Sequence, residues 1–391
     1  MRVLFYIERF DFGLGGVVQY VYQWTQALAT HGCQITLVTS FDRDIPPAWT
    51  ASQPTGNPRV HTLDRPAGRF GWLNHQQLKQ LDEWSADCDV VHLHGPWDLG
   101  VNRWARRLRN RGLPYIVSTH GMLDDWSLSQ KPLRKRLMLS WCVRSFLRGA
   151  AAIHCTALAE SQQVTGNVSG LPEPVCIPPI LSFTDEANMP DDQLAYTAFP
   201  DLRPEAFKML FLSRIHYKKG IEWLLKAAAR CKASGGEWQV LVAGPGEPKY
   251  IAQLQAEAER LGIADDVLWL GMVRDPVKTA LYRAADVFVL PTQQENFGIV
   301  LVEAMAAGLP VITTRGTDIY REIEEGGALI VGLSADSLSS SLTRLRNNSA
   351  EREERGRRGA TMVRQWLDYP RVLEQQMQLY RRSMKPRIGT S

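Results

Sequence analysis

Short apolar runs alternate with longer amphipathic stretches along most of the chain. Such runs are typical of buried strands, and the stretches between them have the periodicity of helices. The alternation predicts α/β layering with parallel sheets. The predicted strands span residues 3–7, 34–39, 90–93, 115–118, 152–155 and 175–177 in the first half, and 208–212, 239–243, 267–270, 287–290, 311–314 and 328–331 in the second.

The alternation is interrupted between residues 181 and 205, where Asp, Pro and small polar residues replace the apolar periodicity. The interruption predicts a linker between two doubly wound, Rossmann-like domains that hold a ligand cleft between them. The expected boundaries are 1–185 for the first domain, 186–205 for the linker and 206–370 for the second domain. Residues 371–391 are expected to form a C-terminal helix that packs back on the first domain.

The stretch ENFGIVLVE, residues 295–303, places two carboxylates around an apolar run. Residues 299–307 predict a buried helix, because they are apolar at every position except Glu303. An unpaired ionised carboxylate there would cost several kcal/mol. Glu303 therefore either has an internal partner or faces a cleft that binds a polar group. Glu295 lies in the loop before the helix, where ligands of open α/β sheets bind.

Two further loops combine glycine or basic residues with a preceding strand. In FGLGGVVQY, Gly15 and Gly16 permit a backbone that approaches an anion closely, although a tight strand-to-helix turn is the alternative. Gly244 follows a strand in the same way. Arg214 and Lys219 follow strand 208–212 and suit a diphosphate, unless they form only a solvated basic turn.

Polar residues of the first domain offer weaker signals. His120 follows a strand and either hydrogen-bonds a substrate hydroxyl or is structural. His92 and His94 share one face of their strand, but a metal pair would need a third ligand that is not apparent. Asp124 and Asp125 serve either as an acid or base or as the cap of the next helix.

Charge is concentrated in one part of the chain, although the net formal charge is only +4. Residues 103–148 hold eleven cations against Asp124 and Asp125, a balance of +9. The segment KPLRKR, residues 131–136, either lays a basic amphipathic surface on anionic lipid or is a solvated helix face. The apolar residues near this segment are Leu133, Leu137, Leu139 and Trp141. Nucleic acid is a less favoured partner, because the cations lack interleaved aromatic residues.

Cysteine use and hydropathy favour a cytoplasmic protein. The six cysteines are scattered without a C-x-x-C pair, which fits a reducing compartment. The first residues are too charged for a signal peptide, and no run of about 18 apolar residues predicts a membrane-spanning helix.

Taken together, the motifs resemble glycosyltransferase family 4, retaining enzymes of the GT-B fold. The resemblance covers nearly the whole chain and is strongest over residues 211–331. Its most specific element is the E-x7-E motif of Glu295 and Glu303, followed by the R-x4-K-G loop from Arg214 and the glycine loop at Gly15. Departures are PPI at residues 178–180, where the family often has PNG, and Tyr217, where proline is frequent.

The resemblance implies roles for these residues. Glu303 would accept hydrogen bonds from the ribose, and Glu295 would lie near the donor sugar. Arg214 and Lys219 would neutralise the departing diphosphate, and His120 would contact the sugar. The implied catalytic set is Glu295, His120, Arg214 and Lys219, and the implied donor-binding set is Gly15, Gly16, Arg214, Lys219, Gly244, Asn296, Phe297, Gly298, Ile299 and Glu303. The resemblance implies neither a metal nor a protein nucleophile.

These observations predict a retaining, metal-independent glycosyltransferase that uses a nucleotide-sugar such as a UDP- or GDP-sugar and needs no other cofactor. The expected acceptor is a glycan or a lipid-linked molecule of bacterial polysaccharide or glycoconjugate biosynthesis. The expected location is the cytoplasm, with a peripheral position on the inner face of the membrane as a further expectation. The alternatives are a dinucleotide-dependent oxidoreductase and a non-catalytic nucleotide-sugar-binding protein.

Overall fold

The computed structural model describes residues 1–50, 56–64 and 71–384, which divide into two compact units. Unit 1 comprises Met1–Leu181 and the segment from Leu367 onward, and unit 2 is Ser182–Trp366. Each predicted strand is confirmed to within one residue at either end. An additional strand, β3 (Arg59–Thr62), was not predicted, because Val60 is its one strongly apolar residue and the strand lies at a sheet edge.

Unit 1 contains a parallel sheet whose order, over the part of the chain that the structure describes, is β3-β2-β1-β4-β5-β6-β7. The order reverses between β1 and β4, the point at which open α/β sheets bind ligands beyond the carboxyl ends of their strands. Its strands besides β3 are β1 (Arg2–Tyr6), β2 (Gln34–Thr39), β4 (Val90–His94), β5 (Tyr115–Ser118), β6 (Ala152–Cys155) and β7 (Pro174–Cys176).

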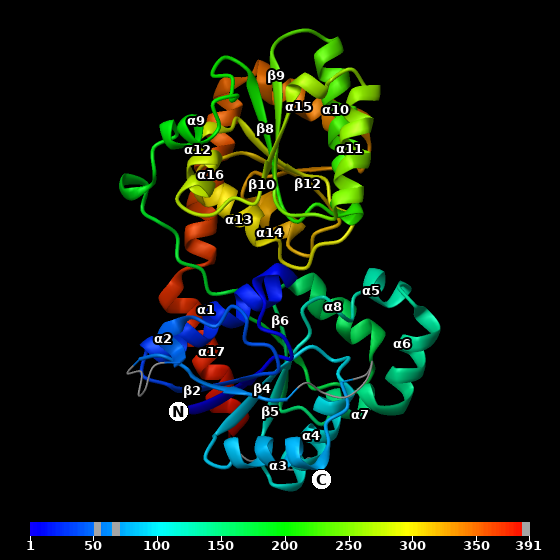
Figure 1. The fold of residues 1–391 in the computed structure, drawn as a ribbon, viewed down its shortest axis with the longest axis vertical. Helices are drawn as coiled ribbons and strands as arrows, with labels where there is room; N and C mark the ends of the chain where they lie inside the picture. The colour runs from blue at the N-terminus through cyan, green and yellow to red at the C-terminus, as the bar shows by residue number, and fades with distance from the viewer. Residues whose placement is uncertain (51–55, 65–70, 385–391) are drawn as a thin grey trace. The chain divides into compact units, whose positions relative to one another are not determined.

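Alternate side chains of β1 enter two different cores of unit 1. Val3 and Phe5 pack with α1 (Gly16–Thr30) and α17 (Tyr369–Met384), whereas Leu4 and Tyr6 pack with helices on the opposite face. Figure 1 shows α17 in red beside the blue first strands, so the end of the chain completes the N-terminal unit. The remaining helices of unit 1 are α2 (Pro47–Thr50), α3 (His75–Trp84), α4 (Leu99–Asn110), α5 (Asp125–Ser129), α6 (Pro132–Met138), α7 (Arg144–Arg148) and α8 (Leu158–Asn167), with a π-helical turn, η2 (Leu139–Val143), between α6 and α7.

Unit 2 contains a second parallel sheet, with the order β10-β9-β8-β11-β12-β13 among the described residues. The strands are β8 (Phe207–Leu212), β9 (Trp238–Ala243), β10 (Val267–Gly271), β11 (Val287–Leu290), β12 (Val311–Thr314) and β13 (Leu329–Val331). The reversal here lies between β8 and β11, so the loop after β11 stands at the ligand-binding position of the sheet.

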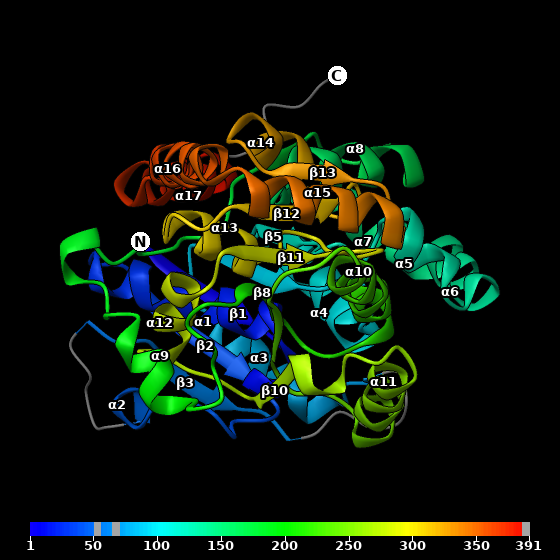
Figure 2. The same ribbon diagram turned by 90° about the horizontal axis from the view of Figure 1, so that it is seen from above.

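Helices cover both faces of the unit 2 sheet (Figures 1 and 2). One face carries α10 (Ile221–Ala233), α11 (Pro248–Arg260) and α15 (Ala335–Asn347). The other carries α9 (Gln193–Ala198), α12 (Val277–Ala284), α13 (Ile299–Ala306) and α16 (Ser349–Trp366). Helix α9 falls within the stretch expected to be a linker and packs on α12, and α14 (Tyr320–Glu325) follows β12.

Within residues 1–50, 56–64 and 71–384, no helix combines the length and the apolar character that crossing a bilayer requires. All six cysteines are free.

Candidate functional site

The loop that carries Glu295 is held by backbone hydrogen bonds to the chain after β12. The Glu295 amide donates to the Gly316 carbonyl at 2.7 Å, and the Asp318 amide donates to the Glu295 carbonyl at 3.0 Å. The loop ends at Gly298, whose φ of +69° lies in the left-handed region. A Cβ at Gly298 would meet Leu301 Cδ1 at 2.8 Å and Glu295 Cγ at 3.0 Å, so both the backbone conformation and the neighbours favour glycine where the loop turns into α13.

Glu303, in the middle of α13, has internal partners. Lys278 Nζ donates to Glu303 Oε1 at 2.9 Å, and Tyr282 Oη donates to Oε2 at 3.0 Å, both from α12. Burial acts to lower the pKa of Lys278, but the carboxylates of Glu303 and Asp275 raise it above its ordinary value. The Glu303 side chain is 24% exposed, so the carboxylate is paired and still accessible from one side. Of the two explanations that the sequence left open for this residue, the structure gives an internal partner.

Lys219 and Arg214 differ in their surroundings. The Lys219 ammonium is buried and contacts the Glu295 carboxylate. Burial, followed by the nearby cations Lys218 and Arg214, lowers the pKa of Lys219. Arg214 is exposed, and its guanidinium bonds to no residue that the structure describes. Of the two predicted residues, Lys219 is therefore held by the Glu295 carboxylate and Arg214 is directed to solvent.

The glycines named by the sequence lie at two strand ends in different units. Gly15 has a φ of +96° and precedes α1, while Gly16 is the first residue of that helix. Gly244 follows β9 with a φ of +133°, and a Cβ there would lie 1.9 Å from the carbonyl oxygen of Ser213. Close approach of the chain to itself therefore explains Gly244 without a ligand, and the donor-binding roles of all three glycines stay predictions.

In unit 1, a buried carboxylate that the sequence reasoning missed fixes the turn containing His120. His120 has a φ of +50°, a strained value for a residue with a side chain. Glu160, fully buried in the first turn of α8, accepts from Thr119 Oγ1 at 2.7 Å and from the Gly121 amide at 2.6 Å. It also accepts from the amide and hydroxyl of Thr156, at 2.7 and 3.0 Å. Its place just after strand β6, at the start of a helix, was the available sequence signal.

His120 lies at one end of a set of packed imidazoles. Burial is the main cause that lowers the pKa of His120 to about 4, so the ring is neutral at pH 7. Its Nε2 lies 2.9 Å from His94 Nδ1. Both nitrogens of His92 are hydrogen-bonded, one to Tyr380 Oη and the other to Ser118 Oγ, each at 2.8 Å. Among the described residues, no three potential metal ligands of the His, Cys, Asp and Glu types lie together.

For Asp124 the sequence left two roles open, an acid or base and a helix cap. It precedes α5, and its carboxylate accepts from the Ser127 amide, so its role as a helix cap is confirmed.

The basic region 103–148 is less uniform than its composition suggests. Arg107 and Arg111 form ion pairs with Asp82, which neutralises part of the charge. Leu139 is 8% exposed and packs in the core, so its expected place on an exposed apolar face is wrong. It follows Leu137 by two residues and therefore points to the opposite side of the helix. The other three apolar side chains near the basic segment are exposed: Leu133 at 82%, Leu137 at 69% and Trp141 at 68%.

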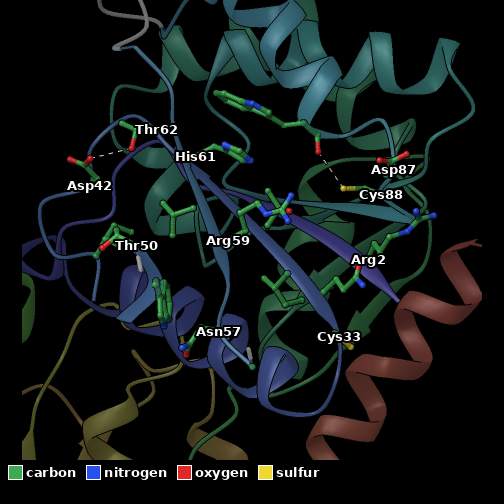
Figure 3. A pocket seen from close by; sticks show the side chains of 18 of the residues that line it. Arg2, Cys33, Asp42, Thr50, Asn57, Arg59, His61, Thr62, Asp87 and Cys88 are labelled. Atoms are coloured by element: carbon green, nitrogen blue, oxygen red, sulfur yellow. Dashed lines mark hydrogen bonds between the residues drawn. The ribbon is translucent and has the colours of Figure 1, made fainter. Parts of the chain in front are cut away.

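A hollow of about 1220 Å³ lies along the edge strand β3 and contains none of the predicted site residues. Figure 3 shows Arg59 and His61 of β3 among its lining side chains. A smaller hollow of about 590 Å³ lies in unit 2 beside the ends of β12 and β13, and Thr292 and Gln293 of the Glu295 loop line it. The predicted donor chemistry is therefore nearer to the smaller hollow.

Two family descriptions match the chain. Residues 195–362 match "Glycosyl transferases group 1", and residues 15–179 match "Glycosyl transferase 4-like domain". Together with the two parallel sheets, these matches place the chain among the glycosyltransferases with the GT-B fold. The glycosyltransferase interpretation therefore replaces the oxidoreductase alternative.

Relatives with known activities extend over almost the whole chain. A phosphatidyl-myo-inositol mannosyltransferase of Mycobacterium leprae is 28% identical over 373 residues, covering 94% of this chain and 92% of that protein. A D-inositol 3-phosphate glycosyltransferase of Paenarthrobacter aurescens is 25% identical and covers 89% of this chain and 88% of its own. The structure of Anabaena HepE in complex with UDP and glucose superposes with a TM-score of 0.78 at 18% identity, covering 97% and 98% of the two chains.

Proposed function

We propose that this chain is a retaining, metal-independent family 4 glycosyltransferase that moves a sugar from a UDP- or GDP-sugar onto a lipid-linked or glycan acceptor in bacterial polysaccharide or glycoconjugate assembly. The observation that carries the proposal is the arrangement of the 295–303 segment. It places one carboxylate in the loop after β11, paired with Lys219, and a second carboxylate on the following helix, paired with Lys278.

The two carboxylates suit the two ends of a nucleotide-sugar. Glu303 is oriented by Lys278 and Tyr282, and an ionised carboxylate has about four lone-pair sites, so acceptor capacity remains for ribose hydroxyls. Glu295 is joined to Lys219 and suits sugar hydroxyls. The intervening Gly298 brings the backbone of the loop into the first turn of α13, and a helix N-terminus favours phosphate oxygens.

The basic loop supplies the electrostatic part of the reaction. When the bond from sugar to diphosphate breaks, negative charge grows on the departing phosphate oxygens. Arg214 is solvent-facing and bonds to no described residue, so its forked donors are free to pair with those oxygens. The buried ammonium of Lys219 adds a second cation. Stabilising charge that develops in the transition state is the role we assign to this pair. The departing phosphate then takes the proton of the acceptor hydroxyl, with attack on the same face of the sugar.

The donor is tested by thermal unfolding of the intact chain in EDTA with UDP, GDP, ADP and their common sugar conjugates. A ligand at about 100 times its Kd adds about 2.7 kcal/mol to stability. For a unit of this size, that raises the melting temperature by about 5–10 °C. We expect one nucleotide class to stabilise wild type and to stabilise Glu303→Ala much less.

Glu324→Ala is the matched control, because Glu324 is an exposed carboxylate of the same unit, on α14. It should respond to the nucleotide as wild type does. Stabilisation that requires a divalent cation would contradict metal independence, and equal responses of the Glu303→Ala and Glu324→Ala variants would contradict the role of Glu303.

The acceptor side of the proposal concerns the α6 segment, residues 131–141. It holds three of the seven large apolar side chains that are strongly exposed among the described residues: Leu133, Leu137 and Trp141. Their spacing of four residues is helical, and Lys131, Arg134 and Arg136 are exposed beside them. Apolar side chains that enter a lipid interface, flanked by cations, attach a protein to an anionic membrane. Each cation near such a surface contributes about 1 kcal/mol.

Membrane attachment is measured by co-sedimentation with vesicles of phosphatidylcholine alone or with about one third phosphatidylglycerol. We expect binding to the anionic vesicles that weakens with salt, and loss of that binding in the triple variant Leu133→Ser, Leu137→Ser, Trp141→Ser. Trp72→Ser is the control, because Trp72 is 43% exposed elsewhere in unit 1. Equal binding of both variants would contradict the assigned surface and favour a soluble acceptor.

A further inference from the structure

His94 lies at the carboxyl end of β4, where its ring contacts the ring of His120. The His94 Nδ1 to His120 Nε2 distance is 2.9 Å. The His94 ring is held from several sides: it stacks on Phe5 at a centroid distance of 5.5 Å, on His92 at 4.5 Å, and meets the edge of Tyr20 at 6.0 Å. The orientation of His94 is therefore fixed by packing within unit 1.

One proton has to be placed between the two histidines. Both rings are neutral at pH 7, because burial lowers the pKa of each. Each ring then carries a single N–H, and either His94 Nδ1–H donates to His120 Nε2, or His120 Nε2–H donates to His94 Nδ1. The two arrangements give His120 opposite properties toward anything that approaches its remaining nitrogen, Nδ1.

The second nitrogen of His94 distinguishes the two arrangements. His94 Nε2 is buried and has no hydrogen-bond partner in the part of the chain that the structure describes. If His120 donated, the proton of His94 would sit on Nε2, as a buried N–H without an acceptor. If His94 donates, Nε2 carries only a lone pair. Buried unpaired N–H groups are rarer than buried unpaired acceptors, so the second arrangement is favoured.

We infer that His94 is a positioning residue that holds His120 in the tautomer with its proton on Nδ1. His120 Nδ1 has no partner among the described residues, and His120 is partly exposed. In this tautomer His120 presents a hydrogen-bond donor, and it recognises an oxygen acceptor of the donor sugar rather than removing a proton from a hydroxyl. This inference rests on the proposed function for the identity of the ligand, but the tautomer itself does not.

Glu160 fixes the backbone that carries the His120 ring. It binds the groups on both sides of His120, the Thr119 hydroxyl and the Gly121 amide, and so holds the backbone at its positive φ. The backbone at His120 is thus held by Glu160 of α8, and the position of the proton on the His120 ring is set by His94 of β4. A ligand that reaches His120 therefore meets a hydrogen-bond donor, the Nδ1–H group, whose direction is fixed before binding.

The tautomer is tested first, by long-range ¹H–¹⁵N NMR on the full chain labelled at histidine, at pH 7.5, with His120 assigned from a His120→Asn variant. We expect His120 Nδ1 to show the shift of a protonated nitrogen and Nε2 that of an unprotonated one. The reverse pattern, or a doubly protonated ring, would overturn the inference whether or not the chain binds any nucleotide.

The positioning role is then tested with two substitutions of His94. His94→Asn keeps an N–H donor near the place of Nδ1, whereas His94→Leu has none. We expect His94→Leu to weaken binding of the nucleotide-sugar by about 3- to 10-fold, the loss of one neutral hydrogen bond, and to leave binding of the nucleoside diphosphate unchanged. His94→Asn should stay within about 3-fold of wild type for both.

The outcomes separate this inference from the proposed function. If wild type binds no nucleoside diphosphate, the proposed function fails while the NMR result still decides the tautomer. If His94→Leu melts with wild type and binds the nucleotide-sugar equally well, or if His94→Asn binds no better than His94→Leu, the positioning role is overturned.

Discussion

Replacing Glu160 with glutamine should destabilise unit 1 strongly, although the two side chains have almost the same shape. The Glu160 carboxylate is fully buried and accepts four hydrogen bonds, two at each oxygen, from Thr119, Gly121 and Thr156. Glutamine keeps one acceptor oxygen and turns an NH₂ group toward the other two donors. Two hydrogen bonds to a charged group, worth about 1.5–3 kcal/mol each, are lost.

The net effect is smaller than that sum, because a buried amide avoids the desolvation of a carboxylate. We expect a loss of about 3 kcal/mol in the unfolding free energy of unit 1. For a unit of roughly 200 residues, this lowers the melting temperature by about 6–12 °C. The turn that contains His120 should loosen at the same time, because the same carboxylate binds the residues on both sides of it.

The assay is differential scanning calorimetry of the whole chain, in which the transition of unit 1 is followed. Gln162→Ala is the control, because Gln162 is exposed on the same helix, α8. If Glu160→Gln melted within about 2 °C of Gln162→Ala, the four hydrogen bonds would not have the structural weight assigned to them.

Three further predictions concern the second unit and the response to pH. Gly298→Ala should lower the melting temperature more than Gly308→Ala. Both glycines have a positive φ, +69° and +78°, but only at Gly298 would a Cβ also meet neighbouring atoms too closely. Equal decreases in melting temperature would show that the neighbours move away from the added Cβ. Lys278→Met and Glu303→Gln should show a coupling of about 1 kcal/mol in a double-mutant cycle of urea unfolding, since the pair is only partly exposed, and additive effects would argue against the pair. Burial lowers the pKa of His154 from 6.5 to about 4. Between these pH values the unfolded chain binds a proton at this residue that the native chain does not bind. Each unit by which the pH decreases in this range therefore lowers the unfolding free energy by about 1.4 kcal/mol. His154→Asn should therefore show a shallower loss of stability between pH 6.5 and 4 than wild type, and parallel curves would contradict the assignment.

The strands were predictable because the central ones are continuous apolar runs that need no knowledge of their neighbours. Residues 287–290 and 311–314 are buried at every position, and both appear with the predicted bounds. Edge strand β3 was missed for the opposite reason, since its residues are largely half-exposed or exposed. Helix α9 was missed because a helix of six residues is too short to show periodicity and depends on α12 for its packing.

The site was predictable only where one segment carries the whole signal. The two carboxylates of residues 295–303 could be identified locally, and Glu303 was recognised as needing a partner. The partners themselves, Lys278 and Tyr282, come from another helix and are brought to it by tertiary packing. The same limit hid Glu160, whose four donors lie in two separate segments that follow β5 and β6, and it left the His94–His120 contact unseen.

Sugar transfer itself is tested most directly by release of the nucleoside diphosphate from the nucleotide-sugar that stabilises the chain. The reaction is run in EDTA, with water or a lipid extract as acceptor, and the released nucleotide is separated by chromatography. The account predicts release by wild type, a decrease of about 10²-fold or more in Lys219→Ala, and a product that keeps the anomeric configuration of the donor. A donor that binds tightly and remains intact would make the chain a nucleotide-sugar-binding protein and would contradict the account.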